Sequence, residues 1–379
     1  MYKYSLKYGK FMKKKFCFVT TGDIKKIATG KRALGMANPL HALGWDIYIL
    51  MEDTPENRHR VALECNTNIH VHYFTAGSAL KEIRQKNKII KKLQPDYVYL
   101  CAFVIRNIVS VPTKCRILTE HSELQSCMNN SLLKEWRFRL TEYYSIFYSD
   151  GLLNASKYLQ SFYTQRCKRI RIKKPMLYFP YAYNRNICTT NDTPIPFSKK
   201  PSDKYFLYMG RFVINYGCFT LVQAFKKIHT INPSLKLLLI GNGNAYQKVL
   251  SYIKEHNLEE TIQATGYIEE EEIPAYFSKA DAFISPMNDT IQDWARCPSK
   301  LYMYLPYRKP IITCRIGEPY EVLKELGVYF EPSNVDSLTN AILRLAEQDQ
   351  WTLDINSLEH EWEYRTHQFH QWITQTFKV

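Results

Sequence analysis

The sequence predicts an α/β protein built from two doubly wound domains. Three observations support this prediction. The chain has 379 residues, enough for two domains that each bury a core of their own. Short apolar runs alternate with helical segments in both halves, as in βα units with parallel strands. A polar, proline-rich segment at residues 186–204 separates the halves and shows no periodicity.

The first half contains a series of short apolar runs, each followed by a loop or a helical segment, as expected of buried parallel strands. The first run leads into Thr21-Gly22-Asp23, where Gly22 would let the backbone approach a ligand closely. The predicted strands are 16–20, 46–51, 69–74, 96–100, 116–119, 151–156 and 176–181. The predicted helices are 36–43, 79–93, 131–148 and, capped by Ser156, a helix to about residue 167.

The second half repeats the alternation of strand and helix. Its predicted strands are 205–209, 235–240, 261–264, 281–286, 309–313 and 327–332. Its predicted helices are 219–229, 298–307, 336–347 and a terminal segment at 358–377. The acidic run 269–272 precedes a further helix, where the macrodipole favours negative charge.

The formal net charge of +15 at pH 7 favours an anionic partner. The chain has no RNP-type strand, zinc-finger spacing or basic leucine zipper, so we expect no nucleic acid partner. An anionic membrane surface fits the charge better. Residues 131–148 mix basic with aromatic and aliphatic residues, which suits a helix at a membrane interface. The same pattern also suits a helix that packs on a sheet and exposes its arginines.

The ten cysteines are scattered and form no C-x-x-C pair, which argues against a zinc site and suits a reducing cytosol. No apolar stretch approaches the ~20 residues that a membrane-spanning helix needs. The basic N-terminal segment 1–16 precedes an apolar run too short for a signal peptide, so we expect a cytoplasmic protein.

Residues 281–320 combine the features of an anion-binding site. A strand at 281–286 is followed by a polar loop and by a helix with Pro298 at its first position, where no backbone N–H partner is needed. Arg296 and Lys300 flank the start of this helix. A helix N-terminus and two cations together favour an anion such as a diphosphate.

The run R-C-P-S-K-L-Y-M-Y-L-P-Y-R-K-P-I-I-T at 296–313 resembles the segment R-x-P-x-K-…-[DE]-Y-L-A-A-G-K-P-[IV]-[IV] of family-4 retaining glycosyltransferases, which are group 1 glycosyl transferases. The run G-R-F-V-I-N-Y-G at 210–217 is similar to the family pattern G-R-x-x-x-x-K-G. The resemblance implies the α/β GT-B fold, in which two Rossmann-like, doubly wound domains face a central cleft. It assigns residues 1–185 to an acceptor-side domain, 186–204 to a linker, 205–355 to a nucleotide-sugar-binding domain, and 356–379 to a helix that packs back on the first domain.

The resemblance implies that one cluster of residues binds the diphosphate of a nucleotide sugar. Arg211 and Lys300 match the family's cations, and the planar fork of an arginine suits a diphosphate. Tyr216 stands where the family has a lysine and can donate one hydrogen bond without bringing charge. The predicted diphosphate-binding residues are Arg211, Tyr216, Arg296, Pro298, Ser299 and Lys300.

Other residues are expected to contact the sugar and the nucleoside. His121 follows the strand at 116–119, and a histidine in this place faces the donor sugar and its phosphate in the family. With Arg211 and Lys300 it completes the predicted catalytic set. The backbone of Gly266 and Tyr267 matches the part of the family that reads the base, and Gly22 completes the predicted donor site.

The family function implied by the resemblance is retaining, hexosyltransferase-type glycosyl transfer. The donor would be a UDP- or GDP-linked sugar, and the acceptor a glycan or a lipid-linked glycan of cell-surface polysaccharide synthesis. No cofactor or metal is expected, because the cationic side chains would neutralise the departing diphosphate. The expected place is the cytoplasm, with peripheral attachment to the inner face of the cell membrane.

Two departures from the family pattern keep alternatives open. Met303 replaces the acidic residue that bonds the ribose hydroxyls, and Ala295 replaces its partner carboxylate. A lost hydrogen bond to a charged group costs about 1.5–3 kcal/mol, so we expect weaker nucleotide binding. The alternatives are a non-catalytic nucleotide-sugar-binding partner and a nucleotide-sugar epimerase on the same fold.

Overall fold

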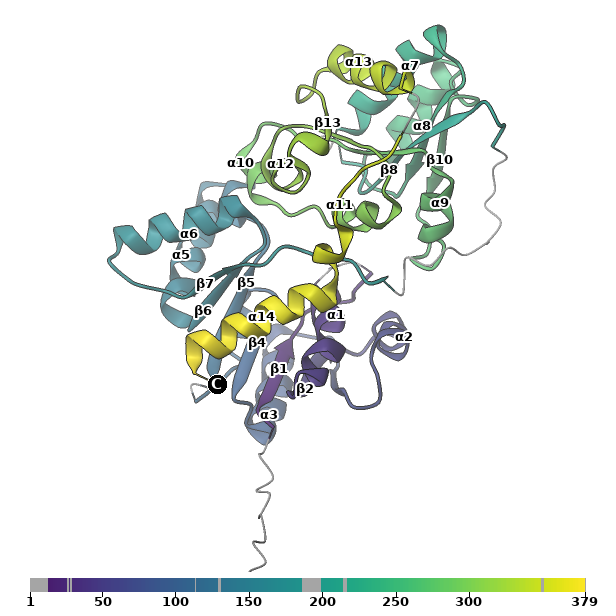
Figure 1. The fold of residues 1–379 in the computed structure, drawn as a ribbon. Helices are drawn as coiled ribbons and strands as arrows, with labels where there is room; N and C mark the ends of the chain where they lie inside the picture. The colour runs from purple at the N-terminus through teal and green to yellow at the C-terminus, as the bar shows by residue number, and fades with distance from the viewer. Residues whose placement is uncertain are drawn as a thin grey trace, which may run out of the picture.

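The computed structural model describes residues 13–25, 27, 29–112, 114–128, 131–185, 199–213, 217–348 and 351–378. The chain forms two α/β domains, each with one parallel sheet between layers of helices (Figure 1). The predicted α/β class with two doubly wound sheets is confirmed. The domain boundaries stay a prediction, because residues 186–198 of the expected linker lie outside the described residues.

The N-terminal sheet has seven parallel strands in the order β3-β2-β1-β4-β5-β6-β7. The strands are β1 Lys15–Val19, β2 Asp46–Glu52, β3 His70–Phe74, β4 Tyr97–Leu100, β5 Arg116–His121, β6 Gly151–Asn154 and β7 Met176–Tyr178. The connecting helices are α1 Thr29–Ala42, α2 Pro55–Glu64, α3 Ala79–Leu93, α4 Ile105–Ile108, α5 Leu132–Tyr148 and α6 Lys157–Arg169, with a 3₁₀ turn η1 at Gln125–Cys127.

The C-terminal sheet has six parallel strands in the order β10-β9-β8-β11-β12-β13. The strands are β8 Lys204–Met209, β9 Leu235–Ile240, β10 Ile262–Gly266, β11 Ala282–Ser285, β12 Ile311–Thr313 and β13 Val328–Tyr329. The helices are α7 Cys218–Ile231, α8 Tyr246–Glu255, α9 Ile273–Lys279, α10 Ile291–Ala295, α11 Ser299–Tyr304, α12 Gly317–Leu323 and α13 Val335–Ala346, and short 3₁₀ turns include η4 Leu305–Tyr307.

Each sheet reverses its strand order at one place. Strand β1 lies between β2 and β4 in the first sheet, and β8 lies between β9 and β11 in the second. Connections on the two sides of such a reversal diverge, which leaves a crevice at the carboxyl ends of the two central strands. A ligand site is therefore expected at the loops that follow β1, β4, β8 and β11.

The C-terminal helix α14 Trp362–Phe377 returns to the first domain and packs across its sheet (Figure 1). Phe369 is fully buried and its ring lies 5.7 Å from the ring of Phe16 in β1. The indole N–H of Trp45 lies 3.0 Å from Nδ1 of His370. A Cβ atom on Gly35 of α1 would lie 2.3 Å from Trp362, so only glycine allows this close approach. Helix α14 thus completes the core of a domain far away in sequence.

The two domains also meet directly. Ser156, the cap of α6, donates a hydrogen bond to the carbonyl of Ala295 at 2.7 Å. The hydroxyl of Tyr178 at the end of β7 donates to buried Glu318 of α12, which also accepts from Tyr302 at 2.5 Å. Burial raises the pKa of Glu318 to about 7, although the two hydroxyl groups oppose this rise.

The acidic run 269–271 makes a second contact between the domains. Lys25 lies 2.8 Å from Glu269, and Lys31 and Arg60 lie 3.0 and 3.1 Å from Glu270. The run precedes helix α9, as the sequence predicted, with Glu272 as the cap of the helix. Its carboxylates also hold the first domain against the loop that follows β10.

The helix predictions failed where the local pattern is weak. Helix α1 begins at Thr29 rather than at residue 36, because its early glycine-containing turns are stabilised by burial rather than by propensity. Helix α2 was not predicted: it is mostly polar and buries only Asn57 and Arg60, although Thr54 caps it. Helix α10 was also not predicted, because five residues are too few to show a period.

Candidate active site

In the crevice of the C-terminal sheet, Lys300 lies beside the loop that follows β8. The ammonium group of Lys300 in α11 lies 4.1 Å from the ring centre of Tyr208. A Cβ atom on Gly210 would lie 3.3 Å from this ammonium, so the backbone before Arg211 passes close to it. Arg211 itself is exposed. A Cβ atom on Gly241, whose φ is +125°, would lie 2.0 Å from the carbonyl oxygen of Gly210, so the turn after β9 requires glycine.

Arg296 adds a third cation to this crevice, held in place by α10. Its Nε lies 2.9 Å from buried Asp293, and Nη2 lies 3.4 Å from the sulfur of Met287. Burial lowers the pKa of Lys300 to about 7, helped by repulsion from Arg296 and opposed by Asp293. Because Arg296 repels the buried ammonium of Lys300, an anionic ligand between these cations is favoured.

Pro298 and Ser299 lie at the start of α11, as the motif predicted, with Pro298 as the residue that caps the helix. The helix has only six residues before it tightens into η4. The dipole of so short a helix is small, so the cationic side chains supply most of the attraction for an anion. Tyr216 lies outside the described residues.

Glu123 of the first domain faces these cations, and the sequence analysis did not identify it. The neighbouring Leu124 is buried in one cluster with Ala295, which fixes the loop after β5 against α10. Glu123 keeps exposed surface, yet desolvation of its carboxyl group by the surrounding protein raises its pKa. The positive charges of Arg296 and Arg211 oppose this rise. The electrostatic interaction joins residues far apart in sequence, so no local pattern could have revealed it.

His121, the last residue of β5, lies behind this loop. It is 6% exposed, and Nδ1 lies 2.9 Å from the hydroxyl of Tyr163 while Nε2 lies 3.3 Å from the hydroxyl of Thr119. Burial, with repulsion from Arg166, lowers the pKa of His121 to about 3, so the ring is neutral at physiological pH. Its expected contact with the donor sugar stays a prediction, and such a contact would be made by a neutral imidazole.

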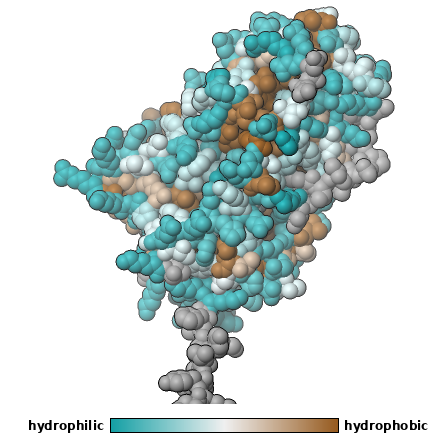
Figure 2. Space-filling view, in the orientation of Figure 1, coloured by the Kyte–Doolittle hydropathy of each residue, from teal (hydrophilic) through white to brown (hydrophobic). Residues whose placement is uncertain are grey.

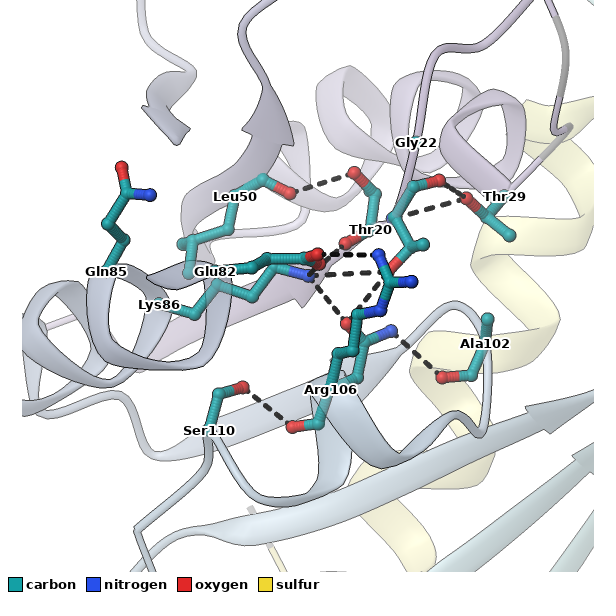
Figure 3. Close-up of polar contacts among 12 residues, drawn as sticks. Thr20, Gly22, Thr29, Leu50, Glu82, Gln85, Lys86, Ala102, Arg106 and Ser110 are labelled. Atoms are coloured by element: carbon teal, nitrogen blue, oxygen red, sulfur yellow. Dashed lines mark hydrogen bonds and ion pairs between the residues drawn. The ribbon is translucent and has the colours of Figure 1, made fainter. Parts of the chain in front are cut away.

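Gly22 lies in the crevice of the N-terminal sheet, in a loop fixed from below by a buried lysine (Figure 3). The ammonium of Lys86 lies 2.9 Å from the carbonyl of Thr20, 2.7 Å from Asn107 and 2.6 Å from Glu82. Lys86 is fully buried, and burial lowers its pKa. Gly22 has a φ of +77°, which favours glycine. The sequence showed only a lysine-rich helix here, because two of the three partners of Lys86, Thr20 and Asn107, lie in other parts of the chain.

Gly266 ends β10, and Tyr267 follows it, on the other side of the Lys300 crevice. Gly266 has a φ of +75°, and its carbonyl accepts a hydrogen bond from the N–H of Gly241 at 2.7 Å. The ring of Tyr267 is 50% exposed, and Lys25 of the first domain lies 4.6 Å from its centre. Lys25 also pairs with Glu269, so the two domains approach each other where the base is expected.

Met303 is half-buried at the junction of the domains. It lines a cavity of about 30 Å³ together with Lys31, Arg60 and Glu270. The position from which the family contacts the ribose is therefore apolar here but surrounded by charged groups. Ala295 is fully buried against the first domain, so its position also offers no polar group to a ligand.

Comparisons with known proteins agree with this arrangement. The family model described as Glycosyl transferases group 1 matches residues 191–368, which include Arg211, Arg296 and Lys300. This chain carries a group 1 glycosyl transferase domain. The predicted resemblance to group 1 glycosyl transferases is confirmed for this part of the chain, and the motif at 296–313 lies inside the matched region. Its finer assignment to the retaining family 4 stays a prediction. A search of curated protein sequences gives no match.

Solved structures with low sequence identity share the fold of the transferase over nearly its whole length. Sucrose-phosphate synthase from Thermosynechococcus elongatus gives a TM-score of 0.75 at 17% identity, covering 97% of this chain and 100% of that chain. HepE from Anabaena, in complex with UDP and glucose, gives a TM-score of 0.75 at 13% identity, covering 96% of this chain and 100% of that chain. The lipopolysaccharide outer core galactosyltransferase WaaB, in its apo form, gives a TM-score of 0.64 at 14% identity, covering 96% of this chain and 100% of that chain. The predicted GT-B fold is confirmed.

Of the predicted site residues of the transferase, the structure brings Arg211, Arg296, Pro298, Ser299 and Lys300 together at one crevice. Gly266 and Tyr267 lie at its edge, and Gly22 and His121 belong to the facing domain. Within the described part of the chain, no three His, Cys, Asp or Glu side chains gather as a metal site would require. That the reaction needs no metal stays a prediction.

Proposed function

We propose that this chain is an active glycosyltransferase that moves a sugar from a UDP-linked donor to a glycan or lipid-linked acceptor of cell-surface polysaccharide synthesis. The observation that carries the proposal is the crevice of a group 1 transferase domain in which Arg211, Arg296 and Lys300 converge. UDP is favoured over GDP because the solved HepE complexes, which share the fold, contain UDP.

In this proposal the chain's own cations perform the chemistry. As the bond between sugar and diphosphate breaks, negative charge grows on the leaving diphosphate, and preorganised cations stabilise that charge. Lys300 is poised for this role because its lowered pKa makes its charge dependent on an anionic partner. Arg296 is oriented in advance by Asp293, so little reorganisation accompanies the reaction. Retention of the anomeric configuration follows from the family resemblance.

Glu123 is the carboxylate that the first domain brings to this crevice, and Ala295 offers none from the second. We assign Glu123 to the acceptor side of the cleft, where a carboxylate can accept a hydrogen bond from an acceptor hydroxyl. A second candidate function is a non-catalytic nucleotide-sugar-binding partner, which the apolar Met303 favours. The two functions differ in turnover but not in nucleotide binding.

Nucleotide binding is tested by thermal unfolding of the full chain with UDP, GDP, ADP and the corresponding sugar nucleotides. A ligand at about a hundred times its Kd stabilises the folded state by about 2.7 kcal/mol, so we expect UDP to raise Tm by several degrees. GDP and ADP are expected to give smaller shifts. The variant Arg211→Ala is expected to abolish the shift, whereas the control Lys227→Ala, on α7 away from the crevice, is expected to retain it. The absence of a shift with every nucleotide would contradict donor binding.

A further inference from the structure

Helix α5 exposes an apolar stripe that no described part of the chain covers. Six of its large side chains are between 49% and 84% exposed, namely Leu132, Leu133, Trp136, Leu140, Tyr144 and Phe147. The helix buries only Glu142, Ser145 and Ile146, so its first ten residues contribute nothing to the described core. Exposed apolar patches of this kind mark interaction sites.

The six side chains lie on one face. At about 100° per residue they fall within an arc of about 120°, and the buried Glu142, Ser145 and Ile146 all lie outside this arc. Figure 2 shows apolar side chains in brown among hydrophilic ones at the end of the first domain that α5 and α6 form. The arrangement is that of an amphipathic helix whose apolar face points away from its own domain.

The stripe continues beyond α5. The hydroxyl of Tyr148 donates a hydrogen bond to the carbonyl of Ile108 at 2.7 Å, which fixes α4 beside the end of α5. Ile105 and Val109, at the two ends of α4, are 62% and 58% exposed. The C-terminal half of α5 is itself held rigidly, because Glu142 pairs with Arg166 at 2.9 Å and accepts from Ser126 at 3.0 Å. The apolar face is therefore presented by a fixed element of the domain.

The residues that border the apolar stripe are mostly basic. On the same helical projection, Arg139 borders one edge of the arc and Arg137 the other, with Lys134 beyond it. Arg139 forms an ion pair with Glu135, with 2.5 Å between nitrogen and oxygen. The guanidinium carbon of Arg137 lies 5.3 Å from the ring centre of Phe138. The whole chain carries a net charge of +15. A second copy of the chain would bring the same positive charge to this face, whereas an anionic lipid surface would neutralise it.

We propose that the exposed face of α5, with Ile105 and Val109, is a docking surface for an anionic membrane, into which Leu133 and Trp136 insert. The inference deepens the proposed function, because it names the surface on which a lipid-linked acceptor would be met. The chain runs from His121 and Glu123 through η1 directly into α5. A membrane bound under α5 therefore lies beside the acceptor side of the cleft.

Flotation of the full chain with phosphatidylcholine–phosphatidylglycerol vesicles tests the surface without any sugar donor. We expect binding that weakens at high salt and is much weaker with pure phosphatidylcholine. The variant Leu133→Ser/Trp136→Ser is expected to lower the partition coefficient about tenfold or more, since each inserted side chain contributes to the transfer. The matched control Ile231→Ser/Leu326→Ser removes two apolar side chains that are 61% and 48% exposed on the other domain, and it is expected to bind like wild type.

Two further measurements separate the alternatives. The double variant of α5 is expected to retain the thermal shift with UDP, so a failure of membrane docking is distinguished from a failure of donor binding. A full-length variant with Lys3, Lys7 and Lys10 replaced by glutamine measures how much the basic N-terminal segment 1–16 (the leader) contributes to vesicle binding. Unchanged flotation of the α5 variant would overturn the proposal, as would complete loss of flotation in the leader variant alone. A concentration-dependent dimer that the α5 variant abolishes would overturn it in favour of self-association.

Discussion

Lys300→Ala lowers kcat/KM for the sugar donor about a hundredfold or more, the loss expected when one preorganised charge contact to the transition state is removed. The ammonium lies beside the backbone of Gly210 and Arg211, where the diphosphate is expected. Arg211→Ala is expected to cause a loss of similar size. Neither side chain contributes to the described hydrophobic clusters, so both variants are expected to fold. Steady-state kinetics at subsaturating donor, with Lys227→Ala as the control, measure the effect.

The pH dependence of UDP binding identifies the charge of Lys300 as the cause. Burial and Arg296 lower the pKa of Lys300 to about 7 in the free protein, and a bound diphosphate favours the charged form and raises this pKa. Above about pH 7, binding must take up a proton, so the affinity of wild type falls by up to about tenfold per pH unit towards pH 9. The phosphates of UDP are already ionised in this range, because their last pKa is about 6.

The Lys300→Ala variant is expected to bind UDP weakly and with little dependence on pH. Wild-type turnover in Lys300→Ala or Arg211→Ala would show that the diphosphate lies elsewhere. A variant that keeps the full pH dependence of wild type would show that another group takes up the proton.

Met303→Glu is expected to strengthen donor binding about tenfold to a hundredfold, with kcat changed little. The expected gain corresponds to one hydrogen bond between a carboxylate and the ribose, about 1.5–3 kcal/mol. The ribose does not react, so a contact to it lowers KM more than it raises kcat. Lys31 and Arg60 line the same cavity as Met303 and can accommodate the new carboxylate beside Glu270. Donor titration of wild type and variant gives KM and kcat separately.

Two control variants isolate the carboxylate. Met303→Leu keeps the side chain apolar and of similar size, so we expect KM to stay at the wild-type value. Met303→Gln offers a hydrogen bond without charge, so we expect an intermediate effect. A weaker donor affinity in Met303→Glu would contradict the assignment, because it would show that the carboxylate is repelled by Glu270 rather than bonded to the ribose.

The strands and the motifs of the transferase domain were predictable because they are local features. The boundaries of α3 and β9 match the predicted ranges, since a run of apolar residues or a helical period lies within the element itself. The grouping of Arg296, Pro298, Ser299 and Lys300 was predictable for the same reason, because one short segment carries all four.

The contacts between the domains were not predictable from the sequence. Arg296 acts electrostatically on Glu123, and Lys31 pairs with Glu270, across long stretches of chain, and such pairs leave no periodic pattern. The buried lysine of α3 was missed because a lysine is ordinarily exposed, and because its partners Thr20 and Asn107 approach it only in the folded domain. The burial of His121 behind Tyr163 also depends on α6 packing over β5.

The most direct test of the account is release of UDP from UDP-sugars by the full chain, in the presence of membranes that contain the native acceptor. We expect turnover with at least one UDP-sugar, with a weak donor KM that Met303→Glu improves, and near-complete loss of turnover in Lys300→Ala. A chain that transfers no sugar from any donor at millimolar concentration would contradict the proposed activity; a retained thermal shift with UDP would then leave the non-catalytic nucleotide-sugar-binding partner.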